Sequence, residues 1–328
     1  MARISDVAKH AGVSVATVSR VLAGQGSVSE SARERVLASV KALDYHPDLA
    51  ARRLRSGKTD TLGLIVSDIR NPYFTDVSRA IEDVAYARGM RVLLCNADED
   101  PAKERFYLDM MRDENVAGVI LSPTLQLLSR FRPEDFSFPL VLVDRSNPDT
   151  HADAVVLDNP DAAQRLARHL LDRGCRRIAF FYGAASATGS QRLAGYRSAL
   201  ADAGLEPVPV PIRPTTEDAR QALLAWLDTQ SALPDAIVAS SGLILLGLIE
   251  GLRERGLRWP DDVIIAGFDD MAWTRITSPA LTVIAQPTAD IGRSAIELLL
   301  ARIAEPKQAM RRIVMRGELI VRGSSQPG

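Results

Sequence analysis

Apolar and polar residues follow one pattern over the first 46 residues and another from Thr61 onward. Within residues 4–22, apolar side chains recur at helical spacing in two short segments that are separated by a turn at residues 11–14. A third helix is predicted over residues 29–43, because Ser29 can cap it and apolar positions line one side. The side chains expected to form a small core between these helices are Val7, Ala8, Ala11, Val13, Val18, Val21 and Leu22. The pattern therefore predicts a headpiece of three helices.

The turn between the first two predicted helices contains the residue types that a helix-turn-helix needs. Gly12 tolerates backbone conformations that are costly for other residues, and Ser14 can cap the second helix with its hydroxyl. A helix-turn-helix places its second helix in a groove of double-stranded DNA, whereas an ordinary helical hairpin is the alternative interpretation. The residues of the second helix that are predicted to face outward are Val15, Ala16, Thr17, Ser19 and Arg20.

A short basic segment, YHPDLAARRLRSGK, follows the headpiece at residues 45–58. Isolated helices shorter than about 12 residues are marginal in water, so this segment is not expected to be a stable helix by itself. One interpretation is a partly helical linker. The other is a hinge helix that folds against DNA, where Leu54 enters the minor groove as an apolar wedge. Phosphate contacts would then come from Arg52, Arg53 and Arg55.

From Thr61 onward, short apolar runs alternate with segments of helical periodicity, and this alternation occurs in two successive series. Repeated β-α-β units imply parallel sheets that are covered by helices on both faces. The predicted strands are residues 61–67, 91–95, 117–121, 140–144, 177–182, 208–212, 236–240 and 263–268, with final strands near residues 313–321. The predicted helices are residues 71–89, 101–112, 160–172, 190–203, 217–228, 243–255 and 288–304.

The predicted fold class is therefore α/β, with an N-terminal all-α helix-turn-helix headpiece followed by two tandem doubly wound α/β lobes. The expected domains are a headpiece over residues 1–46, a hinge helix and linker over residues 47–60, and a core over residues 61–328. Within the core, the first lobe is expected at residues 61–159 and 288–316, and the second at residues 160–287 and 317–328.

Charge is distributed unevenly, although the formal net charge is only -1 at pH 7. Residues 1–60 hold ten lysines and arginines against six acidic residues, whereas the rest of the chain holds 30 against 35. A basic headpiece on a mildly acidic body can bind DNA phosphates while the body stays away from the polyanion.

Sequence features of an enzyme, a secreted protein or a membrane protein are not found in the chain. The four histidines are scattered, and no P-loop, GxSxG, HExxH or metal-ligand spacing is present. Asp98 and Asp100 are interpreted as surface or pocket hydrogen-bonding residues, and Cys95 and Cys175 as buried free thiols. The N-terminal segment, which begins MARISD, has no apolar region typical of an export signal, and no run approaches the roughly 20 apolar residues of a membrane span. We therefore expect a cytoplasmic protein that is not an enzyme and uses no cofactor and no metal.

Taken together, several segments resemble the LacI/GalR family of transcription regulators. They are VSVATVSRVL in the headpiece, YHPDLAARRLRSG in the hinge, NPYF after the first strand, Asp158-Asn159, QRLAGY at residues 191–196, GFDD at residues 267–270 and LTVIAQP at residues 281–287. The resemblance covers nearly the whole chain. It implies a repressor that binds a palindromic DNA operator as a homodimer, with a periplasmic-binding-protein-like core that holds a small carbohydrate-type effector between its lobes. Whether dimers pair further is left open.

The resemblance also assigns DNA contacts to particular residues. It places base-reading positions at Val15, Ala16 and Arg20, with Thr17 and Ser19 on phosphates or base edges. Arg20 can contact guanine with two hydrogen bonds, whereas the two apolar residues offer no hydrogen bond to a base. The hinge residues that it implies in DNA binding are Ala51, Arg52, Leu54 and Arg55, of which Ala51 and Leu54 would lie at the minor groove.

For the effector site, the resemblance implies residues from both lobes. They are Tyr73, Phe74, Arg145, Thr188, Arg192, Arg213, Asp269 and Gln286. Many sugar-binding members carry an acidic residue where this chain has Ser240-Ser241-Gly242-Leu243, which leaves the arginines less compensated. We therefore hypothesise an anionic effector held between arginines, a sugar acid such as gluconate or ketogluconate, that releases the repressor from DNA. A corepressor-dependent regulator and a small-molecule-binding protein without DNA function are the alternatives.

Overall fold

The computed structural model describes residues 2–23, 28–45, 59–147 and 149–326. The chain divides into two compact units, residues 1–59 and residues 60–328, and each is described by itself. The hinge residues Ala51, Arg52, Arg53, Leu54 and Arg55 lie outside the described residues. Within the described part of the chain, no helix combines the length and apolar character needed to span a membrane.

The first unit contains three helices around a small apolar core. They are α1 (Ile4–Ala11), α2 (Val15–Ala23) and α3 (Glu30–Ala42). Gly12 adopts φ 66°, the left-handed conformation that ends α1 and favours glycine. The Ser14 Oγ accepts a hydrogen bond of 3.1 Å from the backbone N–H of Thr17 at the start of α2. The buried core residues of this unit are Val7, Ala8, Ala11, Val18, Val21 and Val36.

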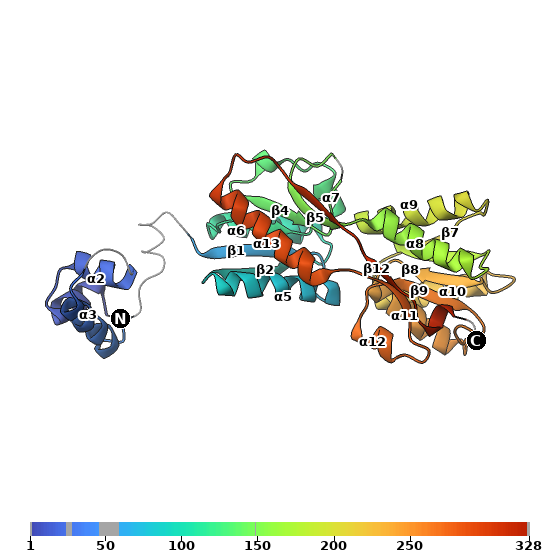
Figure 1. Ribbon diagram of the computed structural model, residues 1–328, viewed down its shortest axis with the longest axis horizontal. Helices are drawn as coiled ribbons and strands as arrows, with labels where there is room; N and C mark the ends of the chain where they lie inside the picture. The colour runs from blue at the N-terminus through green and yellow to red at the C-terminus, as the bar shows by residue number, and fades with distance from the viewer. Residues whose placement is uncertain (1, 24–27, 46–58, 148, 327–328) are drawn as a thin grey trace. The chain divides into compact units, whose positions relative to one another are not determined.

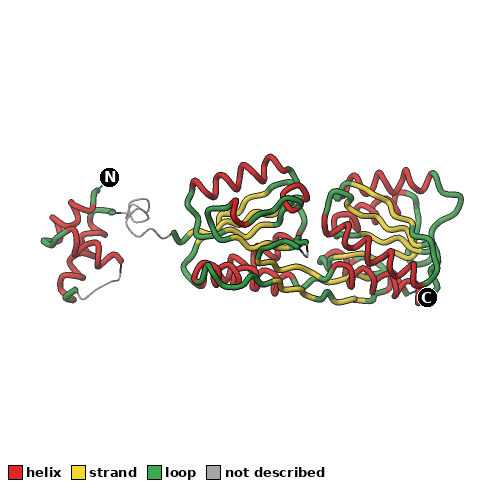
Figure 2. Tube along the Cα trace, turned by 90° about the horizontal axis from the view of Figure 1, so that it is seen from above, coloured by secondary structure: helices red, strands yellow, loops and turns green. Residues whose placement is uncertain are grey.

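The second unit contains two six-stranded sheets, and in Figure 2 each sheet is flanked by helices on both faces. The first sheet has the order β11-β5-β4-β3-β1-β2, with β1 (Thr61–Val66), β2 (Arg91–Asn96), β3 (Val119–Leu121), β4 (Leu140–Val143), β5 (Asp153–Leu157) and β11 (Arg312–Met315). The helices of this lobe are α5 (Pro72–Ala87), α6 (Pro101–Asp113), α7 (Leu125–Leu128), η1 (Pro133–Asp135) and α13 (Thr288–Ala304). Helix α13 packs against α5 on one face of the sheet (Figure 1).

The second lobe repeats this architecture. Its sheet has the order β12-β10-β9-β8-β6-β7, with β6 (Ile178–Gly183), β7 (Val208–Ile212), β8 (Ala236–Ala239), β9 (Ile264–Phe268), β10 (Thr282–Ala285) and β12 (Glu318–Ile320). Its helices are α8 (Asn159–Asp172), α9 (Ala187–Asp202), α10 (Thr216–Asp228), α11 (Gly242–Glu254), α12 (Ala272–Ile276) and η2 (Gly323–Ser325). Among the described strands, only β10 and β12 pair in antiparallel orientation. The predicted fold class is thus confirmed.

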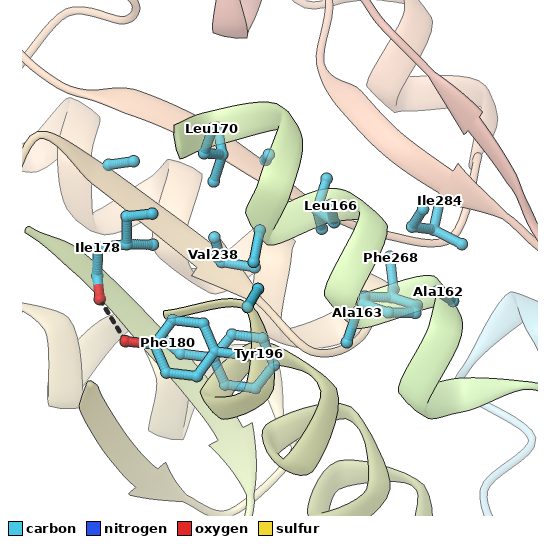
Figure 3. Close-up of a cluster of buried hydrophobic side chains, with 14 of the residues drawn as sticks. Ala162, Ala163, Leu166, Leu170, Ile178, Phe180, Tyr196, Val238, Phe268 and Ile284 are labelled. Carbon is cyan, nitrogen blue, oxygen red and sulfur yellow. Dashed lines mark hydrogen bonds between the residues drawn. The ribbon is translucent and has the colours of Figure 1, made fainter. Parts of the chain in front are cut away.

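The cores of both lobes consist of the apolar strands and the inward faces of the helices. In the second lobe, Leu166 and Leu170 of α8 lie over the sheet, and Phe180 of β6 stacks on Tyr196 of α9 (Figure 3). The Tyr196 hydroxyl donates a hydrogen bond of 2.8 Å to the carbonyl of Ile178, so this buried polar group is satisfied. Both cysteines are buried free thiols, as predicted.

The chain passes between the two lobes at three places, because the strands of each sheet are not contiguous in sequence. The crossings lie between β5 and α8, between β10 and α13, and between β11 and β12. The Asp158 backbone N–H donates to the carbonyl of Met315 at 2.8 Å and ties the first crossing to the third. Any rotation of one lobe relative to the other would therefore have to bend the chain at these three connections.

Candidate functional site

The outer face of α2 in the headpiece is available to a partner. Val15 is 41% exposed, Ala16 and Arg20 are exposed, and Thr17 and Ser19 are partly exposed. Val18 and Val21, three residues apart on the opposite side of α2, are buried in the headpiece core, and their burial fixes this orientation of the helix. The Thr17 hydroxyl also lies 2.9 Å from the Ser14 hydroxyl. The exposed face is therefore short and basic, with Arg20 as its charged group.

A cavity that is partly open to solvent lies between the two lobes of the core, with about 530 Å³ of empty space when the solvent at its mouth is included. It is at the carboxyl ends of the parallel strands, where open α/β sheets bind their ligands. The predicted effector residues that line it are Tyr73, Phe74, Arg145, Thr188, Arg192, Asp269 and Gln286. Arg213 is not among the lining residues, although its neighbour Pro214 is. The lining residues that sequence reasoning missed are Asp68, Asn71, Glu99, Asp144, Ser186, Pro214, Ser241 and Leu243.

Two aromatic residues enter the cavity from the first turn of α5. Asn71 caps this helix by accepting a hydrogen bond of 3.1 Å from the Tyr73 N–H, and Pro72 occupies the first helical position. Tyr73 and Phe74 meet edge to face, with ring centroids 5.0 Å apart and an interplanar angle of 80°. The pair presents a preformed apolar surface on which a sugar ring can stack.

The Tyr73 hydroxyl is buried and makes no hydrogen bond of normal geometry with the described residues, although the Asp144 carboxylate lies near enough to interact with it. Burial raises the pKa of Tyr73 well above its ordinary value, and the charge of the nearby Asp144 carboxylate raises it further. The hydroxyl therefore stays protonated and can donate a hydrogen bond at physiological pH. A buried hydroxyl without a partner costs roughly 1–3 kcal/mol, which a ligand that bonds to it can recover.

Arg192 reaches the cavity from α9 and is held in a fixed orientation. Its Nε donates to Asn159 Oδ1 at 2.8 Å, and its Nη1 donates to the carbonyl of Ser240 at 2.5 Å. The guanidinium also lies over the ring of Phe268, with its central carbon 4.1 Å from the centroid. Its Nη2 makes no hydrogen bond with the described residues, so the two N–H groups of Nη2 are free for a ligand. Burial lowers the pKa of Arg192, but the charges of Asp269 and Asp144 oppose this shift.

Asp269 and Gln286 form the acceptor side of the cavity. The Asp269 backbone has φ 76°, and its carboxylate accepts from the Gly242 N–H at 2.8 Å and from Gln286 Nε2 at 2.7 Å. Because a carboxylate only accepts hydrogen bonds, the amide nitrogen of Gln286 must face it. The Gln286 Oε1 is consequently turned away from Asp269, and it is buried without a hydrogen-bond partner among the described residues.

Arg145 is paired with carboxylates rather than free. Its Nη1 and Nη2 donate to the two oxygens of Glu99 at 2.7 and 2.5 Å, and its Nε donates to Asp144 at 3.2 Å. Burial lowers the pKa of Arg145, but the hydrogen bonds and charges of Glu99 and Asp144 outweigh burial, so the pKa is raised. Burial also raises the pKa of Asp144, against the opposing charges of Arg145 and Arg192.

The charge around the cavity is mixed. The N-cap residues of α5, α9 and α11, which are Asn71, Ser186 and Ser241, all line it, so three helix N-termini with partial positive charge face the space. The charged lining residues are the carboxylates of Asp68, Glu99, Asp144 and Asp269 and the guanidiniums of Arg145 and Arg192. Across the described residues, no group of three or more histidines, cysteines and acidic residues could hold a metal ion.

Comparison with known proteins bears on both sites. Residues 3–48 match the family of bacterial regulatory proteins of the lacI type, and residues 167–325 match the periplasmic binding protein-like domain. The ribose operon repressor of Halalkalibacterium halodurans is 36% identical over 329 residues, which cover 100% of this chain and 98% of that protein. Relatives of this kind are named as transcriptional regulators or repressors and not as enzymes.

Solved structures agree with this assignment. The Lac repressor dimer bound to operator and the anti-inducer ONPF has a TM-score of 0.90 at 23% identity, with 99% of each chain covered, and shows the same fold. A LacI family transcriptional regulator from Enterococcus faecium with bound ribose has a TM-score of 0.72 at 27% identity, and the match covers 80% of this chain and 98% of that one. The chain belongs to the LacI family and is a DNA-binding transcriptional repressor.

Proposed function

We propose that this repressor binds a palindromic operator as a homodimer and is released from it when a small neutral sugar binds between the core lobes. The observation that carries the ligand assignment is the pair of buried, unpartnered polar atoms, Tyr73 Oη and Gln286 Oε1, in a cavity with an aromatic pair. One atom donates and the other accepts, which matches the hydroxyl groups of a sugar. Two relatives named for ribose, or solved with ribose bound, support the same ligand class.

A neutral ligand fits the charge of the cavity better than an anion does. Arg145 has its Nη atoms on the Glu99 carboxylate, and the charges of Asp269 and Asp144 act on Arg192 although neither is hydrogen-bonded to it. An additional carboxylate would enter a site that already holds more acidic than basic side chains. The sugar acid inferred from the arginines in the sequence is the second candidate, because the free Nη2 of Arg192 could bind a ligand carboxylate.

DNA binding is proposed to use the exposed face of α2, with Arg20 on a base and Val15 and Ala16 in apolar contact. The hinge residues Ala51, Arg52, Leu54 and Arg55 keep their proposed role at the minor groove and the phosphates. Two headpieces related by two-fold symmetry would read the palindrome. Tyr86 of α5 and Leu94 of the edge strand β2 are large exposed apolar residues that a second copy could cover.

Release requires that the sugar binds one arrangement of the lobes better than the other. A ligand that contacts both lobes can favour one relative orientation of the lobes over another. The three crossings between the lobes are the segments of chain that would have to adjust. We propose that this change weakens operator binding. A corepressor would strengthen operator binding instead.

A thermal-shift screen tests the ligand class. Neutral pentoses and hexoses are compared with the matching aldonic acids, since a ligand at 100 times its Kd stabilises the folded protein by about 2.7 kcal/mol. We expect a rise in Tm with at least one neutral sugar and a smaller response to its acid. A rise in Tm with aldonic acids alone would overturn the proposal that the effector is a neutral sugar.

Tyr73→Phe tests whether the unpartnered hydroxyl serves a ligand. Without sugar, the variant should be as stable as the wild type or more so, because it removes a buried polar atom that has no partner. Sugar affinity should fall by roughly 3- to 10-fold, the loss of one hydrogen bond. Melting temperature and isothermal titration give the two readouts.

Tyr196→Phe is the matched control. The hydroxyl of this second buried tyrosine donates to the Ile178 carbonyl and accepts from the Val208 N–H at 2.8 Å, within the core of the second lobe. Its loss should lower the melting temperature and leave sugar affinity unchanged. If Tyr73→Phe instead destabilised the free protein as Tyr196→Phe does, the hydroxyl would be structural.

A further inference from the structure

Glu99 lies in a strained turn that directs its side chain to the cavity. The turn follows β2, and both Asp98 and Glu99 adopt the left-handed conformation, with φ 52° and 57°. Such positions are uncommon for residues other than glycine and persist where surrounding contacts enforce them. Here the Glu99 N–H donates to the carbonyl of Ser67 at 3.0 Å, which ties the turn to the end of β1.

The Glu99 carboxylate occupies the outer edge of the Arg145 guanidinium. A guanidinium has five N–H groups. Two of those of Arg145 bind the Glu99 oxygens, one binds Asp144 and one binds the carbonyl of Pro123 at 3.2 Å. At most one N–H therefore remains for a ligand, and the edge that matches a carboxylate with two parallel hydrogen bonds is already filled.

This arrangement separates two classes of ligand. A sugar hydroxyl needs a single donor or acceptor, and the cavity supplies these at Tyr73, Arg192 and Gln286. A ligand carboxylate at Arg145 would have to displace Glu99 or accept the repulsion of a second negative charge beside it. We infer that Glu99 is the residue that makes the effector site selective for neutral sugars over sugar acids, an inference that rests on the proposed effector function.

Glu99→Gln tests this directly, because it keeps the size of the side chain and removes the charge. We expect the ratio of aldonate affinity to neutral-sugar affinity to rise by roughly tenfold or more, as a guanidinium becomes available to a carboxylate. Glu99→Ala, which also frees the space, should raise the ratio at least as much. Isothermal titration of the full-length protein with neutral pentoses and hexoses and with their aldonic acids gives both affinities.

Asp98→Asn is the matched control. It removes one negative charge from the same turn, and asparagine tolerates the left-handed backbone as well as aspartate does. Its carboxylate binds Asn96 and Lys103 and is not part of the cavity lining. The affinity ratio should therefore stay at the wild-type value. If this affinity ratio rose as much in Asp98→Asn as in Glu99→Gln, the effect would be due to net charge, and the proposed role of Glu99 would be wrong.

The outcomes also separate this inference from the proposed function. If folded Glu99→Gln and Glu99→Ala variants gain no aldonate affinity relative to neutral sugar, the role of Glu99 is wrong, whatever the wild type binds. If the wild type binds no neutral sugar but the variants acquire aldonate binding, the ligand class proposed for the wild type is wrong and the role of Glu99 stands.

Discussion

Sugar affinity should fall by roughly 10- to 150-fold when Arg192 is replaced by methionine, because hydrogen bonds from a charged donor are worth about 1.5–3 kcal/mol. The guanidinium is held by Asn159, Ser240 and the Phe268 ring, so its free Nη2 has a defined position in the cavity. Methionine fills a similar volume in the buried site. Isothermal titration against the sugar found by thermal shift measures the change.

Two further variants sharpen this result. Arg192→Lys keeps the charge but loses the planar fork of donors, and we expect an intermediate affinity. Arg168→Met removes an exposed arginine that is paired with Asp202 on the outside of the second lobe, and it should bind sugar as the wild type does. A folded Arg192→Met variant with wild-type affinity would contradict the proposed site.

Operator binding should be lost, with at least about a 100-fold fall in affinity, when Val36 is replaced by aspartate. Val36 is 0% exposed at the centre of the headpiece core. An unpaired carboxylate there costs several kcal/mol, and a core of this size supplies only about 3–5 kcal/mol. Fluorescence anisotropy with labelled operator measures the loss. Sugar binding should persist, because residues 60–328 form a separate compact unit.

Leu37→Asp provides the matched comparison at the next residue of α3. Leu37 is 49% exposed, so the same new charge meets water and the headpiece stays folded. Operator affinity should fall less than about tenfold, through the added charge near the DNA phosphates. Wild-type operator affinity in Val36→Asp would show that the headpiece does not mediate DNA binding.

Most of the fold could be predicted from the sequence because helix and strand periodicities are clear. Helix α13 and strand β7 have the predicted bounds, and other helices differ by a few residues at their ends. Strand β5 was missed because it follows β4 with no intervening helix, so the rhythm of β-α-β units does not reveal it. Strand β10 and the short helices α7 and α12 were missed as well, since short elements carry little periodicity.

The lining of the cavity could be predicted only in part. Residues at the start of α5 and in α9 were found through their motifs, whereas Glu99 was not. The acidic run Asp98-Glu99-Asp100 shortly after strand β2 was a visible signal, because the carboxyl ends of parallel strands meet at one edge of a sheet. Its pairing with Arg145, 46 residues away, depends on how two turns meet in space. The anionic ligand expected from the arginines in the sequence was therefore inferred without knowledge of the carboxylate that pairs with Arg145.

In the proposed function, a ligand between the lobes controls DNA binding by the headpiece. The operator affinity of the full-length protein, measured by fluorescence anisotropy at fixed salt with and without a saturating neutral sugar, tests this control. Saturating sugar should lower the operator affinity of the wild type, and the same sugar concentration should have a much smaller effect on Arg192→Met. Equal wild-type operator affinities with and without bound sugar would show that the ligand does not control DNA binding.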